Sequence, residues 1–147
     1  ELNVCFVEEL NYCEDFLVCA KILQKKIEVA YLDRAYYHYD QIVNNESITR
    51  IFSAKTLEQL KLFVANIEKL FPDQKDIIVS NKLTVKFSVF EANMPQEFKQ
   101  LYPEVNNAFW NLKTSVLNRI LLFMANIGLF RIAYNLYSLK NNRKHRC

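Results

Sequence analysis

Two neighbouring carboxylates, Glu14 and Asp15, stand where a helix is expected to begin. Apolar side chains then recur at helical spacing and lysines gather at the far end, which predicts a helix from residue 14 to about residue 26. An ionised carboxylate beside a substrate hydroxyl can act as a general base, and the positive end of a helix dipole favours the ionised form. The pair also has a structural explanation, because acidic residues cap the free N–H groups at a helix start. The pair alone leaves both roles open.

Aromatic residues lie beside this pair and in a run further along the chain. Tyr12 and Phe16 flank the carboxylates, and the run from Tyr36 to Tyr39 contains His38. Rings of this kind can stack on a sugar, and a histidine can approach a sugar or a phosphate. Each residue also fits a structural role, as a core aromatic or, for His38, as a half-buried residue of a strand. These residues are candidates for ligand binding, with the structural role as the alternative.

The elements that must position these residues are mostly helices. The chain has one glycine and three prolines among 147 residues, too few for the many tight turns of a β-sandwich or barrel. We therefore expect a mainly α fold with a bundle-like C-terminal region and a short two-strand β element near the N-terminus, between residues 27 and 39. Helical stripes of apolar residues are expected over residues 57–71, 79–90, 105–127 and 129–139.

Several kinds of site are excluded by composition. A single glycine leaves no Gly-rich phosphate loop or dinucleotide fingerprint, since those motifs bring bare backbone N–H groups to a phosphate. There is no Asp-x-Asp pair to hold a divalent metal against a nucleotide diphosphate. Four cysteines without a C-x-x-C pair, together with two histidines, do not give the spacing of a zinc site. We expect no metal ligands and no cofactor in this chain.

Charge is distributed unevenly along the chain. Residues 1–104 carry 12 basic and 16 acidic side chains, whereas residues 105–147 carry seven basic side chains and no acid. This asymmetry predicts that the C-terminal end faces something anionic, such as membrane lipid, nucleic acid or an acidic protein surface. Nucleic acid is not the expected partner, because no binding motif is present and the basic residues do not alternate with a clear aromatic platform.

The most apolar run, residues 120–125, lies between Arg119 and Asn126. It is shorter than the roughly 20 residues that span a bilayer, so no transmembrane span is predicted. A helix with apolar residues beyond one stripe and basic residues nearby can lie in a membrane interface. It can equally belong to a soluble core whose rim is solvated by lysine and arginine. Both alternatives remain open at this point.

Taken in order, residues 6–52 show a succession of short motifs. They are Phe6-x-Glu8-Glu9, Glu14-Asp15-Phe16, an amphipathic helix, Val29-Ala30-Tyr31-Leu32, Tyr36-Tyr37-His38-Tyr39 and Glu46-Ser47-Ile48-Thr49. This order and spacing resembles the C-terminal part of bacterial family-2 (GT-A type) glycosyltransferases, in which an acidic pair ending in Asp opens the acceptor-side helix. Two positions depart from the family pattern: Cys13 stands where a glycine usually precedes the pair, and Asp40 where an arginine often follows the aromatic strand.

The resemblance implies a function and a division of the chain. Asp15 would be the catalytic base of an inverting transfer from a nucleotide-sugar to a glycan or lipid-linked acceptor in polysaccharide biosynthesis. Acceptor-binding residues would be Glu14, Tyr12, Phe16 and His38. Residues 1–53 would be the acceptor-side end of the catalytic domain, and residues 54–147 a helical C-terminal region with a basic tail.

The donor site, with its divalent Mg or Mn, would lie upstream of Glu1, so this fragment would be inactive alone. The expected location is the cytoplasm, with the basic tail able to reach an anionic membrane surface at the inner face of the cell membrane. The alternative is a non-catalytic helical interaction or membrane-docking domain, whose acidic pair only caps a helix.

Overall fold

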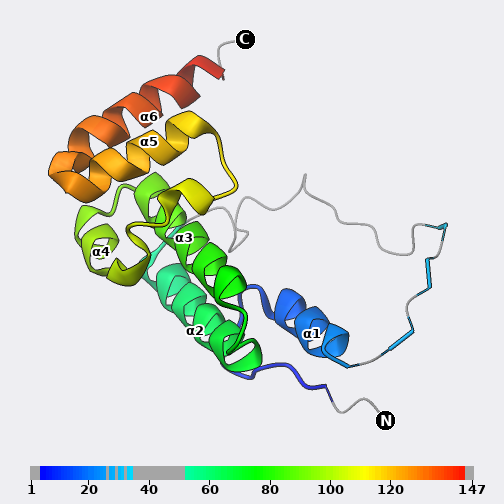
Figure 1. Ribbon diagram of the computed structural model, residues 1–147. Helices are drawn as coiled ribbons and strands as arrows, with labels where there is room; N and C mark the ends of the chain where they lie inside the picture. Colours follow the sequence, from blue (N-terminus) through cyan, green and yellow to red (C-terminus); the bar gives the residue numbers. More distant parts are fainter. Residues whose placement is uncertain (1–3, 26, 29, 32, 35–51, 145–147) are drawn as a thin grey trace. The chain divides into compact units, whose positions relative to one another are not determined.

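The computed structural model describes residues 4–25, 27–28, 30–31, 33–34 and 52–144 (Figure 1). These residues are mainly helical, as predicted, and none of them forms a strand. The chain divides into two compact units, residues 1–70 and 71–147. The first helix after residue 53 therefore belongs with the N-terminal unit, whereas the sequence suggested a functional division after residue 53.

The predicted two-strand element is not seen in the described residues. The N–H of Ile27 bonds to the carbonyl of Lys25, 2.8 Å away, in a tight turn that follows the first helix. Tyr31 is 88% exposed and its neighbour Ala30 is exposed as well, so these two residues, which would point to opposite faces of a strand, are not buried against a sheet. The aromatic run of residues 36–39, with His38, lies outside the described residues.

In the described part of the N-terminal unit, the helices α1 (Glu14–Leu23) and α2 (Ala54–Leu70) pack against each other. Both correspond to predicted stripes. The apolar faces bury Leu17 and Ala20 of α1 and Leu57, Leu60, Phe63, Val64 and Ile67 of α2. The side-chain amide of Gln24 donates to the carbonyl of Leu70, which joins the ends of the two helices.

The C-terminal unit is built from seven helical segments in the described residues. They are α3 (Lys75–Glu91), α4 (Pro95–Gln100), η1 (Pro103–Val105), η2 (Phe109–Asn111), α5 (Val116–Met124), η3 (Ala125–Leu129) and α6 (Phe130–Lys144). The core centres on Phe90 of α3, which is fully buried. Four aromatic rings, those of Phe98, Phe130, Tyr134 and Tyr137, lie with their centroids 5.4–6.1 Å from it. Aromatic packing of this kind fixes how α4 and α6 meet α3.

The prediction of one helix over residues 105–127 is wrong. Tyr102 has a left-handed backbone (φ 44°), and the short 3₁₀ segments η1 and η2 follow it. The α-helix begins only at Val116, where the Ser115 Oγ accepts a hydrogen bond from the N–H of Asn118, 3.3 Å away. A serine in this position starts a helix because it satisfies one of the N–H groups that lack an intrahelical partner.

The segments α5 and α6 form a helical hairpin, named here the α5–α6 hairpin (residues 116–144). Gly128 has φ 97° and ψ −2°, outside the helical region, and at this point the chain turns back so that α6 lies antiparallel to α5 (Figure 1). The Nζ of Lys140 donates to the Asn118 Oδ1 at 2.8 Å and so joins the end of α6 to the start of α5.

By length and composition alone, Val116–Asn141 could cross a membrane, since its mean hydropathy reaches 1.5. This differs from the prediction drawn from residues 120–125. The bend at Gly128 divides the stretch, however, into α5 with 9 residues and α6 with 15 residues. At about 1.5 Å per residue the two helices measure roughly 14 Å and 22 Å, against about 30 Å of hydrocarbon. Neither arm reaches across a bilayer.

Candidate active site

The start of α1 is shaped by an unusual backbone conformation at Cys13. This residue has φ 60° and ψ 23°, in the left-handed region that residues other than glycine rarely adopt. The Cys13 carbonyl accepts the first hydrogen bond of the helix, from the N–H of Leu17 at 3.1 Å. Leu17 is buried, which anchors the first turn. The turn at Cys13 therefore determines where the next two residues, Glu14 and Asp15, stand.

Asp15 is exposed in the first turn of α1. The backbone N–H of Phe16 donates to the Asp15 Oδ1 at 2.7 Å, which orients the carboxylate. The carboxylate is therefore open to a hydroxyl of a ligand that approaches from solvent. Glu14, the neighbouring carboxylate, is half-buried.

Tyr12 and Cys13 are held in their neutral forms. Burial is the main cause that raises the pKa of the Tyr12 phenol, and Cys13 adds to it when its thiol is ionised. Burial, followed by the charges of Asp15 and Glu14, raises the pKa of the Cys13 thiol. A neutral thiol is a poor nucleophile, so covalent chemistry through Cys13 is disfavoured. Tyr12 can instead donate a hydrogen bond to a ligand.

Phe16 packs on the core with one edge while much of its ring stays in solvent. Its centroid lies 5.6 Å from that of Phe63 in α2, in an edge-to-face contact. It is nevertheless 55% exposed. A ring held in this way can offer apolar surface to a ligand with little loss of side-chain freedom.

Gln59 of α2 fixes the loop that leads into α1. Its Oε1 accepts from the N–H of Asn11 at 2.7 Å, and its Nε2 donates to the carbonyl of Glu9 at 3.0 Å. Leu10, between these two residues, is buried. Sequence reasoning missed Gln59, because it lies 48 residues from Asn11 and no local pattern marks the pairing.

The structure thus places four of the five predicted site residues, Tyr12, Glu14, Asp15 and Phe16, at the start of α1, and His38 lies outside the described residues. Within the described ranges, no group of three or more His, Cys, Asp or Glu side chains is arranged to hold a metal ion.

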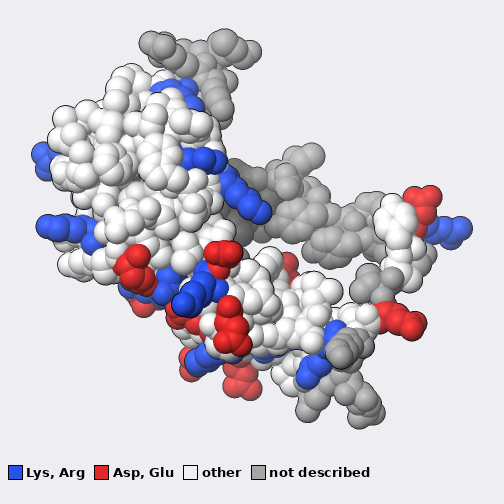
Figure 2. Space-filling view, viewed as in Figure 1, with Lys and Arg blue, Asp and Glu red and all other residues white. Residues whose placement is uncertain are grey.

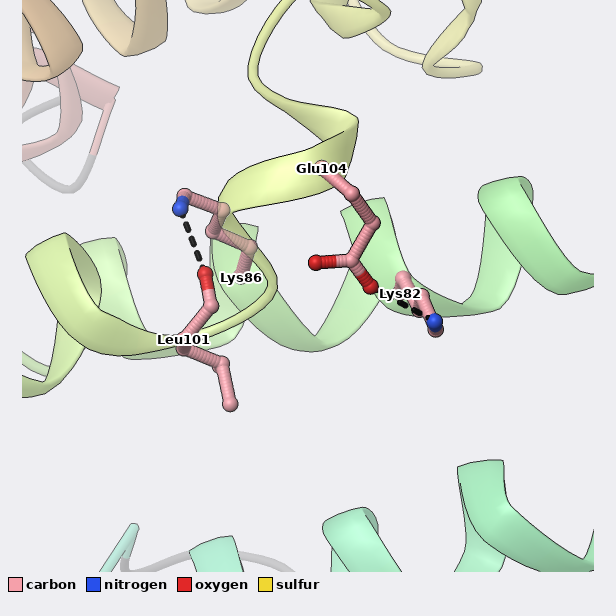
Figure 3. Close-up of polar contacts among 4 residues, drawn as sticks. All are labelled: Lys82, Lys86, Leu101 and Glu104. Carbon is pink, nitrogen blue, oxygen red and sulfur yellow. Dashed lines mark hydrogen bonds and ion pairs between the residues drawn. The ribbon is translucent and has the colours of Figure 1, made fainter.

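A second polar cluster, also missed from sequence, lies in the C-terminal unit (Figure 3). Lys86 of α3 is completely buried, and its Nζ donates to the carbonyl of Leu101 at 2.6 Å and lies 4.8 Å from the ring centroid of Phe98. Burial lowers the pKa of the Lys86 amine to about 8, although the negative charge of Glu104 acts in the opposite direction.

Next to it, Glu104 pairs with Lys82 of α3 at 2.6 Å (Figure 3). This hydrogen bond is the main reason that the pKa of Glu104 is lowered. Lys82 and Lys86 are one helical turn apart, so both attach the segment that follows α4 to the same face of α3. These contacts give Lys86 a structural role, which is to hold the segment after α4 against α3.

Comparison of the chain with protein-family models, with curated proteins and with solved structures finds no match in any of the three. The resemblance to family-2 glycosyltransferases therefore stays a prediction that rests on the motifs between residues 6 and 52.

Proposed function

We propose that this chain is the acceptor-side, C-terminal part of an inverting glycosyltransferase, with Asp15 as its catalytic base. The observation that carries the proposal is an exposed carboxylate in the first turn of α1, directly after the left-handed turn at Cys13. Family-2 enzymes usually carry glycine at the position of Cys13. Glycine adopts left-handed backbone more readily than any other residue, so this conformation at Cys13 is compatible with a position that the family usually fills with glycine.

In the proposed reaction, Asp15 accepts the proton of an acceptor-sugar hydroxyl while that oxygen attacks the anomeric carbon of the donor. The bond from the anomeric carbon to the nucleoside diphosphate breaks, and the configuration at this carbon is inverted. The exposed part of Phe16 would lie against the acceptor, and Tyr12 and Glu14 would bond its hydroxyls, with His38 as a further candidate. A base in this role must be ionised and within hydrogen-bond reach of the attacking hydroxyl.

The nucleotide-sugar itself would bind outside this chain. The described residues offer no set of ligands for the divalent Mg or Mn that the family resemblance implies, and they do not fit such an ion. The proposal therefore assigns the donor and its metal to polypeptide encoded upstream of Glu1, and it implies a cytoplasmic enzyme. An upstream sequence without a nucleotide-sugar domain and an Asp-x-Asp motif would refute it.

The direct test is Asp15→Asn in the enzyme that contains this chain. Loss of a general base typically costs about 10²–10⁴-fold in rate, so sugar transfer should fall by that amount while nucleoside diphosphate binding is unchanged. Asp33→Asn, which neutralises another exposed carboxylate of the same unit, is the matched control and should keep full activity.

The non-catalytic alternative predicts a different result for Asp15→Asn. If the carboxylate only stabilises the helix start, its loss should lower the free energy of unfolding by roughly 0.3–1 kcal/mol and leave transfer intact. Full transfer by the variant would therefore exclude Asp15 as the base.

A further inference from the structure

The α5 arm of the α5–α6 hairpin carries a stripe of apolar residues that is exposed and not packed in the core. The stripe follows i, i+4, i+7, i+11 spacing, which places its members on one face of a helix. Its members are Val116, Ile120, Phe123 and Ile127, which are 61%, 41%, 46% and 57% exposed. The core contacts of this arm come instead from Leu121 and Leu122, which are buried. The sequence suggested the opposite assignment, with the stripe as the packing face.

The α6 arm and the bend carry further exposed apolar residues. The exposed large apolar residues here are Leu129, Ile132, Leu136 and Leu139, at 41–60% exposure. Their i, i+3, i+7, i+10 spacing again defines one side of a helix. Ile127 and Leu129 flank Gly128, so the bend that would normally carry polar turn residues is apolar as well. Exposed apolar surface of this extent marks an interaction site in a soluble chain.

The charge carried by the hairpin itself has one sign, although Glu91 of α3 bonds to Tyr137 on α6. No acidic residue occurs between residues 105 and 147, which carry seven basic ones. Lys113 and Arg131 are exposed among them. In the space-filling view, the surface over α5 and α6 is white with blue atoms around it and shows no red (Figure 2). A partner for this surface must therefore accept both apolar side chains and positive charge.

We propose that the α5–α6 hairpin lies along the surface of an anionic lipid bilayer, with its exposed apolar residues in the boundary between headgroups and acyl chains. Apolar helices flanked by lysine and arginine bind such interfaces, and anionic headgroups attract the basic residues. A second copy of the chain fits less well, because its own hairpin would bring like charge against like charge. The inference does not depend on the proposed glycosyltransferase function.

Co-sedimentation of the 147-residue chain with vesicles tests this proposal. We expect binding to vesicles that contain phosphatidylcholine and phosphatidylglycerol, and much weaker binding to phosphatidylcholine alone. Ile120→Glu with Ile132→Glu should weaken binding roughly tenfold per substitution, because each removes a buried isoleucine from the interface. Lys113→Gln with Arg131→Gln should weaken binding to the anionic vesicles by about fivefold per charge.

Leu23→Glu is the matched control, since Leu23 is 67% exposed on α1, outside the hairpin. It should bind vesicles as the wild-type chain does. Circular dichroism checks that the variants fold, and Ile120→Gln with Ile132→Gln replaces the glutamate pair if that pair loses helicity.

Three results would overturn the inference. The first is that the chain sediments with neither kind of vesicle, and the second is that it binds neutral and anionic vesicles equally. The third is that Leu23→Glu weakens binding as much as a glutamate substitution in the hairpin does. The chain could instead fail to bind vesicles and form a concentration-dependent dimer in analytical ultracentrifugation. If Ile120→Gln with Ile132→Gln abolished that dimer, a second copy of the chain would be identified as the occupant.

Discussion

Replacing Lys86 with methionine should alter the pH dependence of stability more than it alters stability at neutral pH. Burial lowers the pKa of this amine from 10.5 to about 8. At about 1.4 kcal/mol per pH unit, keeping the amine charged in the folded chain at pH 7 costs about 3 kcal/mol. Lys86→Met removes this cost, but it also leaves the carbonyl of Leu101 without its donor, which costs about 1–3 kcal/mol. At pH 7 the two changes largely cancel.

The pH dependence separates the two contributions. Between pH 8 and 10.5 the unfolded chain keeps a proton on Lys86 that the folded chain has released. The free energy of unfolding therefore rises with pH in this window. From pH 7 to pH 9 the wild-type chain should gain about 1 kcal/mol that Lys86→Met does not gain. Tyr137 does not interfere, because burial and its hydrogen bond to Glu91 raise its pKa to about 12.

Urea unfolding followed by circular dichroism, under reducing conditions and across this pH range, measures the effect. Comparing the two proteins at each pH removes the contribution of every group that they share. Lys75→Met, which removes an exposed lysine from the same helix, should behave like the wild-type chain. If the stabilities of wild type and Lys86→Met run parallel from pH 7 to pH 9, the argument from burial is wrong.

Three further predictions use the same unfolding assay. Cys13→Gly should be about 1 kcal/mol more stable than Cys13→Ala, because only glycine relieves the left-handed backbone at φ 60°; equal stabilities would contradict this. Gly128→Ala should lower the free energy of unfolding by about 1–2 kcal/mol, because alanine is strained at a φ of 97°. A β-carbon there meets nothing within 4 Å, so no steric clash adds to this loss. An unchanged stability would show that the bend tolerates a side chain. Ser115→Ala should lower the free energy of unfolding by about 1 kcal/mol, because it removes the hydrogen bond to the N–H of Asn118. Ser115→Asp should keep this hydrogen bond and the stability of the wild-type chain. A loss of stability in both variants would count against a capping role.

Much of the helical framework could be predicted from the sequence, because α1 and α2 bury stripes with simple periodicity. The helix α3 lies where it was predicted, but it buries Val85 and Lys86 as well, which no simple stripe selects. The stretch after Pro103 could not be predicted in this way. Val105 and Phe109 are buried as their spacing suggested, but they reach the core from 3₁₀ turns and not from a continuous helix. Tertiary packing there overrides the local pattern.

The candidate site was predictable only where it is local in sequence. The carboxylates at the start of α1 follow from residue order, and so does the helix that holds them. Gln59 and Lys86 could not be found, because their partners lie 48 and 15 residues away and depend on how helices meet. Nor could periodicity decide which apolar face of α5 is buried, since a helix with apolar residues on both sides has two possible packing faces.

The bend at Gly128 has a consequence for how this sequence could evolve. Drawn straight, the 26 residues from Val116 to Asn141 would measure about 39 Å, more than the hydrocarbon thickness of a bilayer. The only glycine of the chain, flanked by isoleucine and leucine, folds this length back on itself. Loss of this bend would turn two short arms, which we propose to lie in the plane of one leaflet, into a rod longer than the hydrocarbon core of a bilayer.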